Sequence, residues 1–110
     1  MKSVIGKEFT MIKHVIVWKL KEELTTDQKE QVKAEIKAGL EGLAGIIPGL
    51  VSIQVATCGL SSSNMDLMLD SVFETEEALK GYSVHPAHVA VANEKVRPYT
   101  VSRNCFDFII

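Results

Sequence analysis

Residues 12–20 have the sequence IKHVIVWKL, a run of β-branched and aromatic residues that is typical of a β-strand. Because side chains alternate along a strand, His14, Ile16, Trp18 and Leu20 share one face, and Val15 and Val17 share the other. Both faces are therefore largely apolar. We expect a strand that is packed against protein on each side.

The rest of the chain alternates between strand and helix patterns in the order βαβ–βαβ. Thr25 or Thr26 is placed to cap a first helix, and Thr25 and Gln28 have capping-box spacing. Thr75 is placed to cap a second helix, and Pro86 suits the first turn of a third that runs to about Val96. Further strands are expected over residues 51–58, 66–73 and 101–109. This order predicts an α+β, ferredoxin-like fold, which is a four-stranded antiparallel sheet with its helices on one face.

The strands of this sheet carry more apolar side chains than helices on one face can cover. The last strand, for example, alternates Val101, Cys105 and Ile109 with Phe106 and Phe108. A monomer would leave a large apolar surface in water, and a two-fold dimer is the commonest way to cover one. We therefore predict a homodimer in which sheet packs against sheet.

Composition limits the classes of function. The 110 residues fit one domain, which we place at residues 11–110 after an N-terminal extension, residues 1–10. The net charge of −2 and the scattered cations disfavour a nucleic-acid or membrane partner. No apolar run has the length of a membrane span or resembles a signal peptide, so we expect a cytoplasmic protein. Cys58 and Cys105 are then expected to be reduced, half-buried thiols.

Three segments together resemble one known family. They are MIKHVIVWKLK at 11–21, IIPGL at 46–50 and YSVHPAHV at 82–89, and they are similar in sequence and order to the stress-responsive A/B barrel (Dabb) family. The resemblance covers about residues 11–110. It implies a dimeric α+β barrel, which agrees with the dimer predicted from the strand faces.

The family includes a plant polyketide cyclase that closes a linear polyketide by intramolecular aldol condensation. Similarity to that enzyme implies that His88 is a general base, that Tyr82 is its hydrogen-bonding partner and that His14 is a further catalytic residue of the pocket. Where the cyclase has a histidine in its third strand, this chain has Leu67. The residues that we expect to contact substrate are His85, Trp18 and Leu67.

The physical chemistry of residues 85–88 supports two interpretations. Near a helix N-terminus, His88 is biased towards the neutral imidazole that accepts a proton. A histidine next to a proline also commonly caps a helix or binds a backbone group, which would make His85 and His88 structural. A metal held by His14, His85 and His88 is disfavoured, because zinc-binding histidines on a helix are spaced i and i+4.

The resemblance also implies a cation site, because some family members bind Mg²⁺ through backbone carbonyls near the dimer axis. The matching positions are Ala44, Ile47 and Leu50, although a plain hydrophobic turn explains them equally well. No organic cofactor is expected. Two functions stay open: an enzyme that catalyses a cyclase- or lyase-type proton transfer on a small apolar carbonyl compound, and a non-catalytic ligand-binding or stress-response module.

Overall fold

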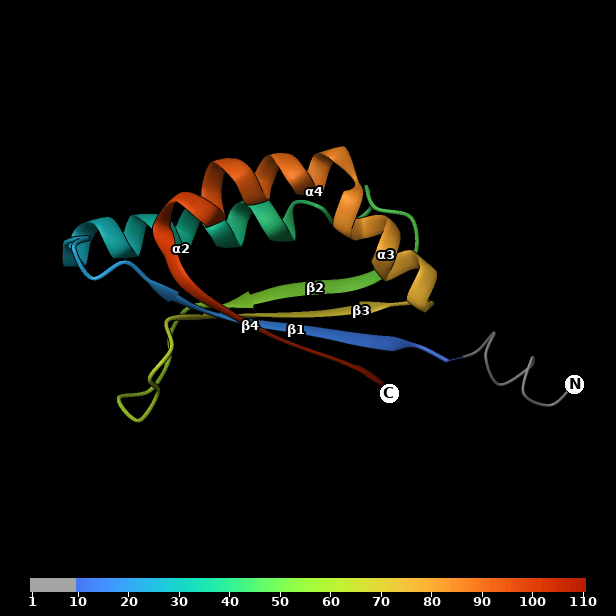
Figure 1. The fold of residues 1–110 in the computed structure, drawn as a ribbon, viewed down its shortest axis with the longest axis horizontal. Coiled ribbons are helices and arrows are strands. Elements are labelled where there is room, and N and C mark those ends of the chain that lie inside the picture. Colours follow the sequence, from blue (N-terminus) through green and yellow to red (C-terminus); the bar gives the residue numbers. More distant parts are fainter. Residues whose placement is uncertain (1–9) are drawn as a thin grey trace, which may run out of the picture.

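A computed structural model describes residues 10–110, and the predicted N-terminal extension lies almost entirely outside the described residues. Its strands form one antiparallel sheet in the order β2–β3–β1–β4, and the helices lie on one face of that sheet (Figure 1). The predicted ferredoxin-like arrangement is therefore confirmed. In order along the chain, the elements are β1 (Ile12–Leu20), α2 (Thr26–Glu41), β2 (Leu50–Ala56), β3 (Leu67–Phe73), α3 (Glu76–Val84), α4 (Pro86–Val91), η1 (Ala92–Val96), η2 (Arg97–Tyr99) and β4 (Thr100–Ile109).

Strand β1 lies between β3 and β4, and its burial alternates as its sequence predicts. Every even-numbered residue from Ile12 to Leu20 is buried beneath the helices, whereas the odd-numbered residues are half-buried on the opposite face. In β3, Leu67, Leu69, Ser71 and Phe73 are likewise buried beneath the helices. These two strands form the floor of the core.

The helices begin where side chains satisfy their first backbone N–H groups. Thr25 and Gln28 form the complete capping box that their spacing predicts, with bonds of 2.8 and 3.1 Å. Thr75 caps α3 by accepting a bond from the Ala78 N–H. The turn before β2 needs glycine at Gly49, which has a φ of 80° and would place a Cβ 2.5 Å from the Cβ of Ala78.

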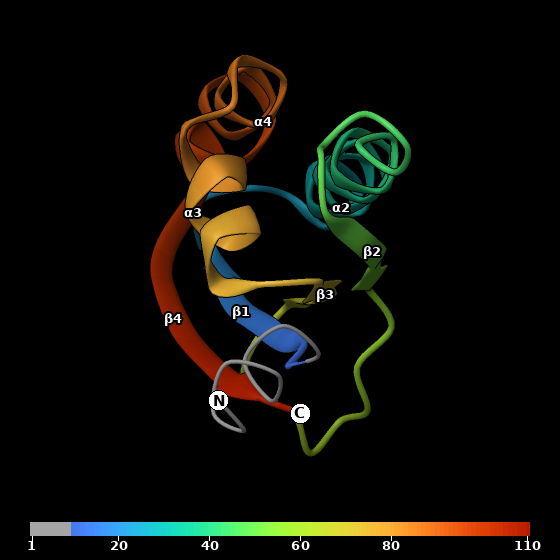
Figure 2. The ribbon, with the colours of Figure 1, turned by 90° about the vertical axis from the view of Figure 1, so that its right-hand side faces the viewer.

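The face of the sheet that points away from the helices is open. Figure 2 shows α2 and the α3–α4 segment side by side on one side of the sheet, and β4 curving up towards α3. We call this opposite side the open face, and its apolar members are Val15, Val17, Met68, Val72, Phe106 and Phe108. Phe106 is 68% exposed there. The apolar open face predicted from the sequence is therefore present.

Several element boundaries differ from the prediction. Strand β2 ends at Ala56 rather than residue 58, because the polar loop begins earlier. The helix opened by Pro86 does extend to Val96, but its last turn widens into a π-helix. The expected half-burial of Cys58 and Cys105 is wrong: Cys58 lies beyond the end of β2, and Cys105 lies on β4, which a single chain leaves exposed. Among residues 10–110, no helix is both long and apolar enough to cross a membrane.

Candidate functional site

A cavity of about 170 Å³ lies between the sheet and the helices. Its apolar floor comes from β1, β3 and α2, whereas its polar groups come from His14 of β1, from the helical segment 82–97 and from β4. The residues that line it are His14, Ile16, Trp18, Leu40, Leu69, Tyr82, Ser83, His88, Ala92, Val96, Arg97 and Arg103. An apolar cavity with a few polar groups is the usual form of a small-molecule site.

His88 stacks on Tyr82 within this cavity. Their ring centroids lie 4.1 Å apart with an interplanar angle of 34°. His88 Nδ1 lies 3.4 Å from the carbonyl oxygen of Ser83, and because a carbonyl only accepts, this contact places a proton on Nδ1. In the neutral ring, Nε2 then carries the lone pair. Burial lowers the pKa of His88 below its ordinary value, and the nearby charges of Arg97 and Arg103 lower it further.

The Tyr82 hydroxyl is a buried polar group that has no hydrogen-bond partner within residues 10–110. The residue is 2% exposed, and burial raises the pKa of the phenol to about 12. The resemblance implies a hydrogen bond between Tyr82 and His88, but in the structure the two rings stack instead. A buried hydroxyl without a partner costs stability, and such groups are commonest where a ligand binds.

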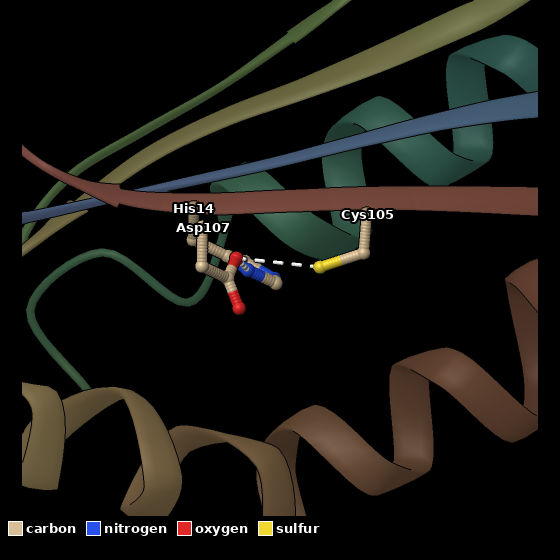
Figure 3. A group of neighbouring side chains, drawn as sticks. All are labelled: His14, Cys105 and Asp107. Carbon is tan, nitrogen blue, oxygen red and sulfur yellow. Dashed lines mark hydrogen bonds and ion pairs between the residues drawn. The ribbon is translucent and has the colours of Figure 1, made fainter.

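His14 is held by an acidic partner on the adjacent strand. Its Nδ1 donates to Asp107 Oδ1 over 2.5 Å, and the same oxygen accepts a bond of 3.3 Å from the Cys105 thiol (Figure 3). His14 pairs in register with Asp107, and Ile16 pairs with Cys105, so all three polar side chains point towards the helices. Partial burial, then the bond and charge of Asp107, raise the pKa of Cys105, which favours the thiol over a nucleophilic thiolate.

These three side chains are also a metal-capable group within the described chain. Nitrogen, sulfur and oxygen donors of His14, Cys105 and Asp107 all lie within 4.8 Å of one another. Donors of these types suit Zn²⁺, and three protein ligands would leave a fourth position open. In the structure, Asp107 Oδ1 links the three side chains through its hydrogen bonds to His14 and Cys105.

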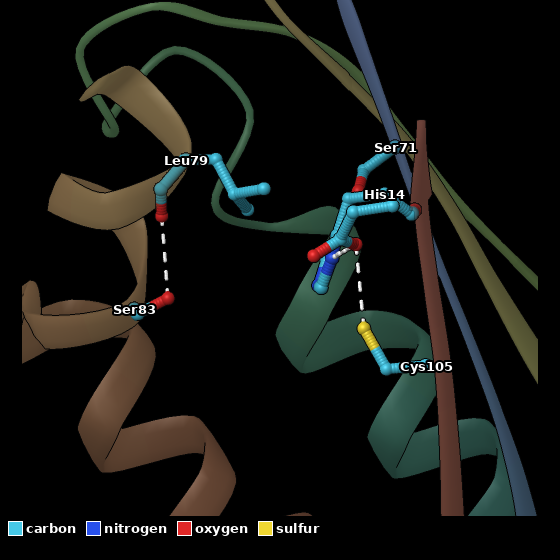
Figure 4. A network of polar contacts seen from close by, with 6 residues as sticks. His14, Ser71, Leu79, Ser83 and Cys105 are labelled. Atoms are coloured by element: carbon cyan, nitrogen blue, oxygen red, sulfur yellow. Dashed lines mark hydrogen bonds and ion pairs between the residues drawn. The ribbon is translucent and has the colours of Figure 1, made fainter. Parts of the chain in front are cut away.

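The helix side of the site is also fixed by polar contacts. Figure 4 shows the Ser83 hydroxyl of α3 bonded to the Leu79 carbonyl, facing His14 and Cys105 on the sheet. Ser71, which is fully buried, donates to the backbone carbonyl of His14 over 3.0 Å. The backbone that carries His14 is thus tied to its neighbouring strand, and its ring packs edge-on to Tyr82 at 5.9 Å.

Comparison with known proteins decides the family. The model of the stress responsive A/B barrel domain, Dabb, matches residues 12–110. This chain belongs to the Dabb family. Olivetolic acid cyclase of Cannabis sativa is 32% identical over 81 residues, which is 71% of this chain and 76% of the cyclase.

Solved structures share the Dabb fold. A protein of unknown function from Bacteroides fragilis, described as dimeric and ferredoxin-like, superposes with a TM-score of 0.85 at 27% identity, covering 91% of this chain and 96% of its own. Hydroxynitrile lyase of Passiflora edulis superposes with a TM-score of 0.69 at 18% identity, covering 93% of this chain and 94% of its own. The second likeness concerns the fold alone.

Not every predicted site residue of this Dabb protein lies at the cavity. Tyr82, His88, His14 and Trp18 line it together. His85 is not among the lining residues. Its Nδ1 accepts a bond from the Ala87 N–H over 3.1 Å, so the ring caps α4, as the structural alternative expected.

Leu67 and the predicted cation positions lie elsewhere. Leu67 is buried opposite Trp18 and lines a separate hollow that includes the 59–66 loop. At the loop before β2, the Ile47 carbonyl accepts a bond from the Leu50 N–H, while Ala44 is exposed. The carbonyl cation site at Ala44, Ile47 and Leu50 stays a prediction.

Sequence reasoning missed two arginines of the site. Arg97 directly follows the helix that is expected to end at about Val96, and no site role is predicted for it or for Arg103, yet both line the cavity. The signal was available in the alternation of β4. Residue 103 shares a face with Cys105 and Asp107, and it pairs with Trp18 of β1.

Proposed function

We propose that this protein is a homodimer that binds a small apolar carbonyl compound and catalyses a cyclase- or lyase-type proton transfer. His88 is the general base, and Tyr82 and His14 complete the polar side of the cavity. The observation that carries the proposal is the pairing, in one cavity, of an imidazole biased towards its neutral form with a buried phenol that has no hydrogen-bond partner among residues 10–110.

The proton transfer follows from the positions of these groups. His88 Nε2 takes a proton from the carbon next to a carbonyl, which leaves an enolate. The Tyr82 hydroxyl, with a pKa of about 12, keeps its proton and donates a hydrogen bond to the oxygen on which the charge develops. In a cyclase, the enolate carbon then bonds to a second carbonyl carbon of the same molecule, and the His88 proton passes to the new alkoxide.

The cyclase arm is supported by the identity of 32% to olivetolic acid cyclase. The substitution of Leu67 for a histidine of the cyclase argues for a different substrate within the same class of chemistry. The hydroxynitrile lyase shares only the fold, so it adds no evidence for the reaction.

The homodimer part of the proposal rests on the open face. Phe106, Phe108 and Met68 are exposed in the single chain, and burying a large apolar side chain contributes about 1.5–3 kcal/mol. The neighbour from Bacteroides fragilis is described as dimeric. The expectations of a cytoplasmic location, of no nucleic-acid or membrane partner and of no cofactor stay predictions.

A non-catalytic ligand-binding module is the second candidate, and one observation favours it. Tyr82 stacks on His88 without a hydrogen bond, so the two residues do not form a ready acid–base pair in the free protein. A ligand that binds in this cavity without losing a proton would satisfy the same geometry.

Proton abstraction can be measured without knowing the natural substrate. We expect the protein in D₂O to speed deuterium incorporation next to the carbonyl groups of small 1,3-diketones, followed by ¹H NMR. General-base catalysis contributes typically 10²–10⁴-fold, so His88→Gln should lose roughly that factor.

His85→Gln is the matched control, because it removes the neighbouring imidazole, whose ring caps α4. It should retain the exchange activity. Binding of a diketone without accelerated exchange would reject the enzyme and favour the non-catalytic module. Equal losses in the two variants would reject His88 as the base.

A further inference from the structure

Both arginines of the chain line the cavity, and none of the lysines that the structure describes does so. The sequence contains ten lysines and two arginines, and the two arginines are Arg97 and Arg103. Arginine differs from lysine in presenting a planar set of N–H donors that matches a carboxylate with two parallel bonds. The position of both arginines at one cavity therefore favours recognition of a carboxylate by shape as well as attraction of a negative charge.

Two unrelated elements bring these arginines together. Arg103 extends from the helix-facing side of β4, opposite Trp18. Arg97 follows the π-helical turn Ala92–Val96, and its own N–H bonds back to the Ala92 carbonyl. Wide turns of this kind occur frequently at functional sites, where they change the direction of the following side chains.

Neither arginine is neutralised by a protein carboxylate within residues 10–110. Arg97 bonds to the Asn93 side chain, and Arg103 lies beside the Cys105 thiol. The ion pairs of the described chain use lysines instead, at Lys13, Lys19, Lys33, Lys37 and Lys95. No Asp or Glu of the described part of the chain lines the cavity. Asp107, which shares the helix-facing side of β4 with Arg103, is bound to His14 and Cys105.

We propose that Arg97 and Arg103 form a carboxylate-binding subsite, so that the ligand of this cavity is a small organic acid with an apolar body. This inference rests on the proposed function, because it names the substrate class of the same cavity. The apolar body contacts Trp18, Ile16 and Leu69 on the floor, and the carboxylate meets the two guanidinium groups. The volume, about 170 Å³, matches a body of about one ring, since an apolar cavity of about 150 Å³ holds benzene.

The subsite also orients the ligand. A carboxylate held by Arg97 and Arg103 leaves the rest of the molecule against His88, Tyr82 and His14. A carbonyl group on the rest of the molecule would then lie beside the His88 imidazole and the Tyr82 hydroxyl, which has no hydrogen-bond partner among residues 10–110. In the free protein, burial first and then the charges of the same arginines lower the pKa of His88.

Benzoate and benzamide test the subsite, because they share shape and differ in charge. Their affinities are measured by ¹H–¹⁵N NMR titration of the intact protein at constant ionic strength. We expect the wild type to bind benzoate about tenfold or more tightly than benzamide, as charge-assisted hydrogen bonds imply. The double variant Arg97→Met and Arg103→Met should lose this preference, while retaining the apolar stems.

Lys80→Met is the matched control, since it removes one positive charge from an exposed position on α3, away from the cavity lining. It should retain the preference for benzoate. If the double variant does not fold, the single variant Arg97→Met at its exposed site gives the same test, with a smaller loss.

Equal affinity of the wild type for the two probes overturns the subsite, as does a preference that survives in the arginine variants. Failure of both probes to bind at millimolar concentration overturns it as well. The result is separable from the proton-transfer test. If the protein prefers benzoate but does not catalyse deuterium exchange, the proposed proton transfer is wrong and the carboxylate subsite stands. If it catalyses exchange but does not prefer benzoate, the proton transfer stands and the subsite is wrong.

Discussion

The two faces of strand β4 carry different chemistry. Towards the helices it presents Arg103, Cys105 and Asp107, which contact the polar side of the cavity or belong to it. Towards the open face it presents Phe106 and Phe108, whose rings lie 5.3 Å apart. Because side chains alternate along a strand, one short segment contributes both to a polar site and to an apolar surface.

The side chains of β1 are divided in the same way, with a polar group of the site towards the helices and apolar groups towards the open face. His14 faces the helices and is bound to Asp107, whereas the next residue, Val15, faces away beside Phe106. A polar residue on the helix side is held by its neighbours before any ligand arrives. An apolar residue on the open face is covered by no helix among the described residues. Changes on the helix side should therefore alter the site and the stability of one chain, and changes on the open face should alter association.

The largest effect is expected on the open face. Phe106→Asp places a charge in the proposed dimer interface, and the two-fold axis repeats the loss in both chains. At about 2 kcal/mol for each copy of a central aromatic residue, the dissociation constant should rise about a thousandfold. Sedimentation velocity at micromolar concentration checks this prediction.

Val101→Asp is the control, because Val101 is 60% exposed on the same strand but lies at the register shift near its start, away from Phe106. It should leave the dimer intact. A stable wild-type monomer, or equal dissociation of both variants, would contradict the assignment of the open face as the dimer interface.

A smaller effect is expected when the two faces lose an equivalent acidic residue. Asp107→Ala leaves the buried His14 without its partner, which costs about 1–3 kcal/mol of unfolding free energy. Asp70→Ala breaks a half-exposed ion pair with Lys13 on the open face, which costs at most about 1 kcal/mol. Urea unfolding of both variants at one protein concentration compares them. Equal losses of unfolding free energy in the two variants would show that the bond between Asp107 and His14 contributes no more than the ion pair on the open face.

Tyr82→Phe should have a smaller effect still, and of opposite sign. The hydroxyl that it removes is buried without a partner, so the free energy of unfolding should stay level or rise by about 1 kcal/mol. If that hydroxyl serves the ligand, the same variant should lose deuterium-exchange activity. Calorimetry and the exchange assay measure the two quantities on one sample. A clear loss of stability would mean that the hydroxyl has a structural partner.

The smallest effect concerns pH. The folded chain holds the pKa of His88 below its ordinary value, so the unfolded chain takes up this proton first as the pH falls. The stability of the wild type should therefore decrease as the pH drops below about 6.5, down to the folded-state pKa. His88→Asn should remove this part of the decrease, as measured by urea unfolding at several pH values. An unchanged pH dependence in the variant would contradict the assigned burial of His88.

Much of the fold could be predicted because its signals are local. The residue types in 12–20 predict a strand with two largely apolar faces, and the spacing of Thr25 and Gln28 predicts the capping box that the structure contains. The order of the strand and helix patterns predicts the ferredoxin-like fold, and the family resemblance agrees with it. The end of β2 and the π-helical turn before Arg97 were missed, because they depend on packing between elements rather than on a repeating pattern.

The site was predictable only in part. His88, Tyr82, His14 and Trp18 were chosen from the sequence and lie at one cavity, but the bond between His14 and Asp107 requires the register of β1 against β4. Arg97 and Arg103 were missed for the same reason, since six residues of sequence and a change of element separate them. Strand register therefore carries the information that residue patterns alone do not.

The central claim is that the helix-facing cavity holds His88 as a neutral base. It is tested most directly by NMR titration of the His88 imidazole, with and without a bound organic acid. We predict that the pKa of His88 lies below the ordinary value of about 6.5 in the free protein, and that the signals of its ring shift when the acid binds. A pKa above about 7, together with no change on adding the acid, would contradict it.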